Sequence, residues 1–263
     1  MRWLKLSTLR PLLWLTIDLP DPFRLTRLLS LPVPAVTLLS IYRHRNSANV
    51  ARMVDQTGWP TRLWSLDEAD SALPVVGVGM DGRFALINKL IRDVPPDHMV
   101  IVADDDVVFQ PGALNTFAAL VDRFNLDLAG PAHAWRGSYY FHRITLRHPW
   151  RIARLTTFVE AGPVLAISSS ARTDFLPFPE EGMGWGAELL WYDRWKSGRR
   201  LGIVDCTAVR HIVPIGLSYD TDPERKRIAE MFAERGIEEW TDVQHNLMSF
   251  YTLRGSGHRD EAR

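Results

Sequence analysis

The sequence predicts an α/β fold with a mostly parallel central sheet flanked by helices. First, short apolar runs rich in β-branched residues alternate along the chain with segments of helical periodicity, the pattern of a doubly wound sheet. Second, one apolar run ends in three adjacent carboxylates, and open α/β sheets bind ligands at the carboxyl ends of their strands. Third, 263 residues with 46% hydrophobic content suffice for one large core and are rather few for two.

The individual elements follow from local pattern. Short apolar runs predict strands at 35–42, 61–66, 75–79, 98–103, 126–130, 155–160, 163–168 and 201–209. Apolar residues at helical spacing, with Pro and Gly as start and stop signals, predict helices at 49–56, 83–92, 112–124, 187–197, 223–235 and 237–251. The segments 155–160 and 163–168 are expected to pair with each other around Ala161-Gly162.

Four regions are expected along the chain: a basic and apolar arm at 1–34, a central domain at 35–217, a helical extension at 218–254 and a flexible tail at 255–263. The arm lacks the uninterrupted apolar stretch of a signal peptide. Two interpretations of it stay open: residues 1–31 contact a membrane surface peripherally, or the arm packs on the domain or moves freely. No run reaches the ~18 apolar residues that span a bilayer.

Composition excludes several classes of protein. Lys plus Arg and Asp plus Glu both number 31, so the formal charge is zero and no nucleic-acid partner held by bulk charge is expected. Cys206 is the only cysteine, which rules out an intramolecular disulfide and a multi-cysteine metal site. A reducing, cytoplasmic location is the prediction that fits this cysteine usage.

The acidic cluster Asp104-Asp105-Asp106 follows the apolar run 98–103 directly. Three adjacent carboxylates repel one another, and a divalent cation such as Mn²⁺ or Mg²⁺ explains their place at a strand end better than packing does. The alternative is a solvated acidic turn. His211 follows a later apolar run, where it is either a further metal ligand or a structural histidine.

A glycine-rich turn, Gly184-Trp185-Gly186, precedes the helix expected from 187. Glu188 then lies in the first turn of that helix, where the macrodipole favours the carboxylate form and suits a base or a hydrogen-bond acceptor. A helix-terminal charge without a catalytic role is the alternative. Trp185 is a candidate for stacking on a sugar face, with a core tryptophan as the equal alternative.

Together these motifs resemble the nucleotide-diphospho-sugar glycosyltransferases of the GT-A fold. The carriers are the first strand with its polar loop, the segment Arg83–Lys89, the Asp-x-Asp at the strand end, the Gly-Trp-Gly-x-Glu turn and His211, and they span most of 35–217. The resemblance implies a metal-dependent enzyme that moves a sugar from a nucleotide-diphospho-sugar to a hydroxyl of a glycan, lipid-linked or small-molecule acceptor. The region 35–217 is then its catalytic domain.

The resemblance also implies roles for single residues. The expected metal ligands are Asp104, Asp106 and His211. Contacts to the donor nucleotide are expected from Ser40, Tyr42, Arg43, Arg45, Asp67, Arg83, Asn88, Lys89, Asp104 and Asp105. Trp185 and Gly186 are expected to contact the acceptor, and Glu188 to act as the base. Leu189 stands where the family has an Asp, so Asp193 or Glu181 are further candidates for the base.

Two other functions stay open. A haloacid-dehalogenase-type phosphohydrolase would use Asp104 and Asp106, although its motif usually lies near the N-terminus and its late Gly-Asp-x-x-x-Asp loop is not found. A catalytically inactive carbohydrate-binding relative is supported by Leu189. A sugar-nucleotide pyrophosphorylase is disfavoured because Arg43-His44-Arg45-Asn46 is not a glycine-rich loop.

Overall fold

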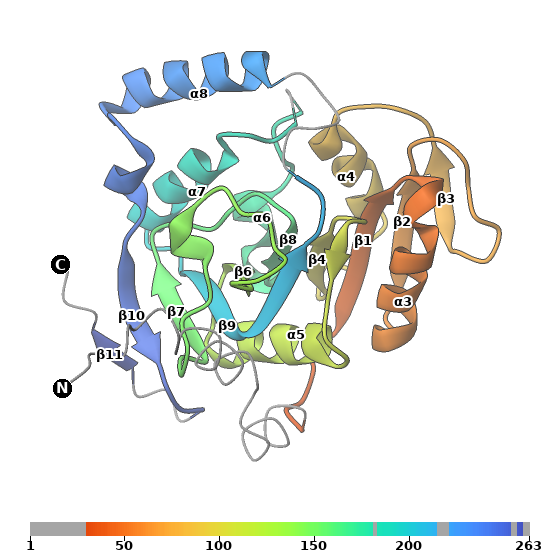
Figure 1. The fold of residues 1–263 in the computed structure, drawn as a ribbon, viewed down its shortest axis with the longest axis horizontal. Coiled ribbons are helices and arrows are strands. Elements are labelled where there is room, and N and C mark those ends of the chain that lie inside the picture. Colours follow the sequence, from red (N-terminus) through yellow and green to blue (C-terminus); the bar gives the residue numbers. More distant parts are fainter. Residues whose placement is uncertain (1–29, 181–182, 215–220, 254–256, 260–263) are drawn as a thin grey trace, which may run out of the picture.

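The computed structural model describes residues 30–180, 183–214, 221–253 and 257–259. In this part of the chain one sheet carries the fold, with strand order β11-β10-β7-β9-β6-β8-β4-β1-β2-β3 and with β5 paired to β9 beside it. Helices cover both faces (Figure 1). The predicted α/β class with a helix-flanked central sheet is confirmed.

One half of the sheet is parallel, whereas the sequence predicted a sheet that is mostly parallel throughout. It contains β1 (Val36–Tyr42), β2 (Thr61–Ser65), β3 (Val75–Val78) and β4 (Met99–Ala103), all in parallel pairs. The helices α3 (Ser47–Thr57) and α4 (Arg83–Ile91) connect these strands. Because the strands run the same way, the loops after β1, β2 and β4 meet at one edge of the sheet.

The other half of the sheet is mixed. Here β8 (Val164–Ile167) lies antiparallel between β4 and β6 (Leu128–His133), while β9 (Leu201–His211) runs parallel to β6 and antiparallel to β7 (Ala153–Thr156). The strands β6 and β9 therefore run in the direction of β4, and β9 ends at the edge where β4 ends.

The predicted pairing of 155–160 with 163–168 is wrong. The strand β7 pairs with β9 and β10, and β8 pairs with β4 and β6. The alternation of side chains along a strand does not specify which strand it pairs with. Here residues 157–163 run from one end of the strands to the other instead of forming a hairpin. This crossing segment brings Glu160 and Ala161 to the edge where β4 and β9 end.

The remaining helices and strands complete the fold. They are η1 (His44–Asn46), β5 (Val107–Val108), α5 (Ala113–Arg123), η2 (Arg143–Thr145), η3 (Ser169–Ala171), α6 (Arg172–Phe175), α7 (Ala187–Lys196), α8 (Asp222–Arg235), η4 (Trp240–Val243), β10 (Asn246–Phe250) and β11 (Gly257–Arg259).

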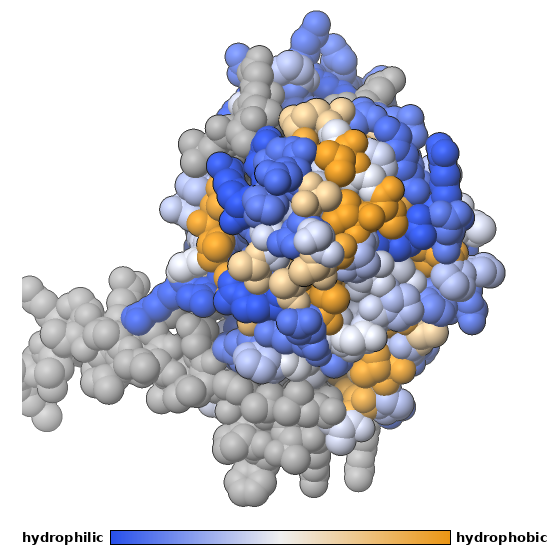
Figure 2. All heavy atoms as spheres, turned by 90° about the vertical axis from the view of Figure 1, so that its right-hand side faces the viewer, coloured by the Kyte–Doolittle hydropathy of each residue, from blue (hydrophilic) through white to orange (hydrophobic). Residues whose placement is uncertain are grey.

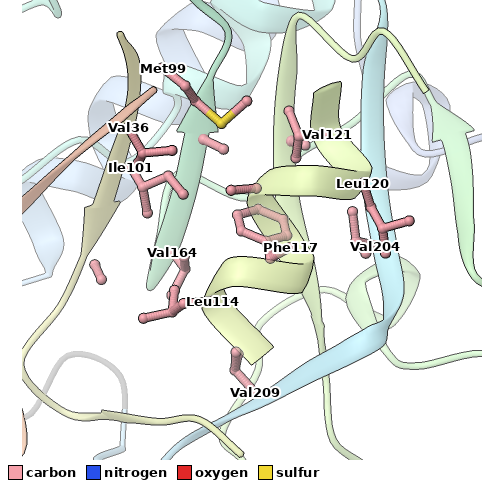
Figure 3. Packing of buried hydrophobic residues seen from close by; sticks show 14 of the residues in the cluster. Val36, Met99, Ile101, Leu114, Phe117, Leu120, Val121, Val164, Val204 and Val209 are labelled. Atoms are coloured by element: carbon pink, nitrogen blue, oxygen red, sulfur yellow. The ribbon is translucent and has the colours of Figure 1, made fainter. Parts of the chain in front are cut away.

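Two hydrophobic cores lie on the two faces of the sheet. On one face, Leu114, Phe117 and Leu120 of α5 pack against residues such as Ile101 and Val204 from the strands (Figure 3). On the other face, α4, α6 and α7 cover alternate strand residues. Alternating side chains of a strand point to opposite faces, so runs such as Val36–Tyr42 and Met99–Ala103 must be apolar on both sides.

The C-terminal region corrects two expectations. A helix forms at α8, but the helix predicted at 237–251 is wrong, because η4 and then β10 occupy that range. The strand β10 pairs antiparallel with β7, so hydrogen bonding at the sheet edge overrides the local helical pattern. The expected flexible tail contains β11, which pairs with β10. The region after 217 thus completes the sheet of the central domain.

The opposite end of the sheet is the edge strand β3. Val76, Val78 and Met80 are exposed there, and Figure 2 shows hydrophobic patches separated by hydrophilic surface on this side of the molecule. Within the described residues, no helix combines the length and the apolar character needed to cross a membrane. Residues 1–29, which make up most of the predicted arm, lie outside the described part of the chain.

Candidate active site

A pocket lies at the edge of the sheet where β4 and β9 end. Its walls come from Arg83 at the start of α4, Asp104 after β4, the crossing segment with Glu160 and Ala161, the Gly184–Gly186 turn with Glu188, and His211 of β9. Phe141, Trp185 and Trp240 add aromatic surface. The pocket thus combines carboxylates, a cation, a histidine and aromatic rings.

The three carboxylates of the acidic cluster have three different partners. Asp104 Oδ1 accepts hydrogen bonds from Arg83 Nε at 3.1 Å and Arg83 Nη2 at 2.8 Å. Asp105 turns to the first loop, where the Arg43 backbone N–H and the Asn46 side chain donate to it at 2.7 and 3.0 Å. Burial raises the pKa of both groups, although Arg83 opposes this at Asp104 and the Arg43 N–H opposes it at Asp105.

Asp106 faces His211, with 3.2 Å between Asp106 Oδ2 and His211 Nε2. Burial lowers the pKa of His211, but the hydrogen bond to Asp106 and the charges of Asp106, Asp104 and Glu160 outweigh it, so the pKa is raised. Nδ1 of His211 is buried and has no hydrogen-bond partner among the described residues.

The donor set of Asp106 and His211 fits a divalent cation. A carboxylate oxygen and an imidazole nitrogen are ligands of Mn²⁺, and Asp106 Oδ2 and His211 Nε2 lie close enough together to bind one ion. In the described part of the chain no three His, Cys, Asp or Glu side chains already converge on one point. Arg83 binds only Oδ1 of Asp104, so Oδ2 of Asp104 stays a predicted third ligand, and substrate oxygens and water would complete the shell.

Glu188 is buried, with 5% of its surface exposed. Its Oε1 accepts the Ala161 N–H at 2.9 Å and its Oε2 accepts the Gly186 N–H at 3.0 Å. Burial raises the pKa of Glu188 to about 7 despite these two amides. The predicted role of Glu188 as a hydrogen-bond acceptor is confirmed, and the backbone N–H groups favour its ionised form as predicted, but loss of solvent opposes them and has the larger effect.

The glycines of the turn are required by close packing. Gly184 has φ +97°, and a Cβ there would lie 2.7 Å from Phe84 Cζ. Gly186 has φ +87°, and its Cβ would lie 2.9 Å from Met231 Sδ of α8. The turn is thus enclosed between α4 and α8. Trp185 is half-buried in the pocket wall, with its ring edge-to-face against Phe141 at 5.3 Å.

Sequence reasoning missed Glu160. Its Oε2 lies 3.1 Å from Nε2 of His133, a histidine that is 2% exposed. Nδ1 of His133 lies 3.0 Å from Ser138 Oγ, which accepts the His211 backbone N–H at 3.0 Å. One signal was present in the chain, since Glu160 is the first acidic residue after 128–159, a stretch that has none.

Other residues predicted to bind the donor nucleotide lie in β1 and in the loops after β1 and β2. The Tyr42 hydroxyl accepts the Asp70 N–H at 3.0 Å, and Asp67 accepts the His44 N–H at 2.7 Å. The hydroxyl of Ser40 is buried in β1 without a partner among the described residues. Arg43 and Arg45 follow in the same loop. These residues flank the acidic cluster through Asp105 and do not line the pocket.

Three further residues predicted to belong to the site also lie outside the pocket. Asn88 binds the backbone N–H and carbonyl oxygen of Phe178 at 2.9 and 2.8 Å. Lys89 forms an exposed ion pair with Asp81 at 2.7 Å. Asp193 pairs with Lys196 and Arg235 on the outer part of α7. Glu181 falls outside the described residues.

The fold matches solved glycosyltransferase structures. No protein-family model and no curated protein matches the sequence. Among solved structures, GalNAc-T7 with UDP, GalNAc and Mn²⁺ has a TM-score of 0.52 at 12% identity over 76% of this chain and 48% of that one. Residues 1–349 of S. aureus TarS have a TM-score of 0.53 at 10% identity, over 76% of this chain and 64% of that one. A complex of the same TarS fragment with UDP-GlcNAc has a TM-score of 0.51.

The chain therefore has an α/β fold with a pocket at the carboxyl ends of β4 and β9. More narrowly, its fold is that of the GT-A glycosyltransferases. At 10–12% identity this likeness establishes the fold alone. The chain spans about half to two thirds of the length of these structures.

Proposed function

We propose that this protein is a metal-dependent glycosyltransferase that moves a sugar from a nucleotide-diphospho-sugar to a hydroxyl acceptor. The proposal depends on one observation: the Asp106–His211 pair and two buried or half-buried carboxylates, Glu160 and Glu188, gather at one edge of a GT-A fold. The complexes of the similar proteins support it, since GalNAc-T7 was solved with UDP and Mn²⁺ and TarS with UDP-GlcNAc.

Cleavage of the donor builds negative charge on the leaving diphosphate. A cation bound at Asp106 and His211 would supply Lewis-acid stabilisation of that charge. Arg83 adds a fixed positive charge at the same edge, and its guanidinium is oriented by Asp104 and by the Ala161 carbonyl oxygen at 3.1 Å. Preorganised charges of this kind stabilise a transition state without reorganising during the reaction.

The acceptor hydroxyl must lose a proton to become a good nucleophile. A positioned carboxylate contributes about 10²–10⁴-fold to such a step. Glu160 and Glu188 both line the pocket, and the aromatic wall of Phe141, Trp185 and Trp240 suits the apolar face of a sugar ring. A glycan, a lipid-linked sugar or a small molecule as acceptor, the cytoplasmic location and a membrane contact through residues 1–31 stay predictions.

The phosphohydrolase alternative is less well supported by the geometry. It needs Asp104 as a free nucleophile, but two Arg83 nitrogens bind one oxygen of that carboxylate. The inactive-relative alternative predicts ligand binding without turnover.

Ligand-dependent stabilisation tests the proposal. We expect UDP or GDP to raise the melting temperature in the presence of Mn²⁺ and not in EDTA, because a ligand at 100 times its Kd stabilises by about 2.7 kcal/mol. Asp106→Ala should abolish this shift, while Asp93→Ala, which removes a carboxylate 72% exposed on the surface, should retain it. The proposal is wrong if neither nucleotide shifts the melting temperature and the protein instead releases phosphate from p-nitrophenyl phosphate.

A further inference from the structure

We infer that Glu160, rather than Glu188, takes the proton from the acceptor hydroxyl, and that His133 and Ser138 position it. This assignment rests on the proposed glycosyltransferase function. It differs from the expectation from the sequence, which named Glu188 as the base and Asp193 or Glu181 as further candidates.

Glu188 is already occupied by structural hydrogen bonds. Each of its two oxygens accepts one backbone N–H, from Ala161 of the crossing segment and from Gly186 of the glycine-rich turn. Its side chain thereby joins two walls of the pocket. If Glu188 took up the acceptor proton, the protonated oxygen would become a poorer acceptor for its backbone N–H, and an unsatisfied buried N–H costs about 1–3 kcal/mol.

Glu160 has the complementary arrangement. Its side chain retains 14% exposure and lines the same pocket. Only Oε2 is bound, to Nε2 of His133, and Oε1 has no hydrogen-bond partner among the residues that the structure describes. One oxygen is therefore oriented by the protein while the other is available to a substrate, which is the geometry that a general base needs.

One arrangement of protons satisfies the hydrogen bonds around His133 with Glu160 as an acceptor. The His211 backbone N–H can only donate, so Ser138 Oγ accepts a hydrogen bond from it. The hydroxyl of Ser138 can then donate its own hydrogen bond to His133 Nδ1. A neutral His133 then carries its proton on Nε2 and donates it to Glu160. With this tautomer, His133 orients Oε2 of Glu160 and leaves Oε1 facing the pocket.

The same series of hydrogen bonds connects Glu160 to the proposed metal site. Ser138 binds the backbone of His211, whose side chain faces Asp106. The base and the metal ligand are thus held by one hydrogen-bonded unit, which fixes the separation between the acceptor oxygen and the leaving diphosphate. The other titratable groups facing Glu160 are Glu188, His142 and His211.

The step balances without a further reagent. The acceptor O–H proton moves to Oε1 of Glu160 as the acceptor oxygen forms a bond to the anomeric carbon. The bond from that carbon to the phosphate oxygen breaks, and its electron pair leaves with the nucleoside diphosphate. A single displacement of this kind inverts the anomeric configuration, so we expect an inverted product.

The test compares Glu160→Gln with Glu188→Gln. UDP-, GDP- and dTDP-sugars are screened with Mn²⁺ and with water as the acceptor, and the donor that the wild type hydrolyses fastest is used throughout. Glu160→Gln should lower kcat by about 10²–10⁴-fold while the calorimetric Kd for the nucleoside diphosphate with Mn²⁺ and the melting temperature stay unchanged. At pH 5, below the pKa of about 7 of Glu188, Glu188→Gln should lower the melting temperature because an amide group replaces one of its two acceptors.

The positioning role of His133 has its own readout. His133→Phe should lower kcat and shift the acid limb of the pH profile of kcat/KM, because Glu160 loses its donor, whereas His133→Gln keeps an N–H donor and should recover part of the rate. A merely structural histidine would change stability without moving that limb.

Three results would overturn the assignment alone: normal turnover by Glu160→Gln, a product of retained configuration, or loss of kcat in a fully stable Glu188→Gln. A wild type that binds no nucleotide and hydrolyses none of the donors would instead overturn the proposed function and this inference with it.

Discussion

Alanine substitutions at Gly184 of the glycine-rich turn and at Gly198 after α7 can distinguish backbone strain from steric overlap, because the two glycines have nearly the same φ. Gly184 and Gly198 have φ of +97° and +96°, but a Cβ at Gly184 would lie 2.7 Å from Phe84 Cζ, while nothing lies within 4 Å of a Cβ at Gly198. Alanine at either site should cost about 1–2 kcal/mol for the left-handed conformation. Gly184→Ala should lose about 1–3 kcal/mol more, because Phe84 is fully buried and cannot move freely.

Urea unfolding of both variants measures this difference directly. We expect a lower midpoint for Gly184→Ala than for Gly198→Ala, with unchanged slopes. Phe84→Leu removes the ring atoms that the new methyl group would meet, so the double variant Phe84→Leu/Gly184→Ala should be less destabilised than the sum of the single variants. Equal midpoints for the two alanine variants, or full additivity with Phe84→Leu, would refute the packing explanation.

Two further predictions concern carboxyl and amide groups at the site. The pKa of Glu188 is raised by burial from 4.5 to about 7, so its contribution to folding is fully present below pH 4.5 and is lost as the pH rises through 7. Between pH 4.5 and 8, the free energy of unfolding of the wild type should therefore fall by about 3 kcal/mol relative to that of Glu188→Gln. Urea titrations of both proteins across this range measure the difference, and a difference that does not change with pH would contradict the prediction. Asn88→Ala should cost about 2–4 kcal/mol because both Phe178 backbone groups lose their partner, with the calorimetric affinity for UDP and Mn²⁺ unchanged; weakened UDP binding in a stable variant would restore Asn88 to the donor site.

Local pattern was sufficient for the elements of the parallel half of the sheet. The runs that form β1 and β4 are apolar on both faces because both faces are covered, and that signature does not depend on any partner. The start of α7 was likewise marked by Gly186. The acidic strand end followed from the same reasoning, because a parallel strand has a defined ligand-binding end.

Features that depend on distant partners were not predictable in this way. The direction of β8 and the pairing of β10 with β7 are chosen by tertiary contacts, and the residues 246–250 show no alternation that separates strand from helix. The buried ion pair of Arg154 and Asp205, both 0% exposed, reads in the sequence as two ordinary charges. The raised pKa of Glu188 was not predicted from the sequence, because a macrodipole contributes only about 0.3–1 kcal/mol, less than its burial.

The acidic cluster shows how far a motif constrains a site. Successive residues leaving a strand point in different directions, so three adjacent carboxylates cannot all face one ligand. Asp104 is used to orient Arg83, and Asp105 fastens the first loop through Arg43. Asp106 alone faces a histidine and is free of a permanent cation among the described residues. The three carboxylates therefore have three different partners, and the other groups of the site come from segments distant in sequence. The crossing segment, which carries no recognisable motif, brings Glu160 to the same pocket.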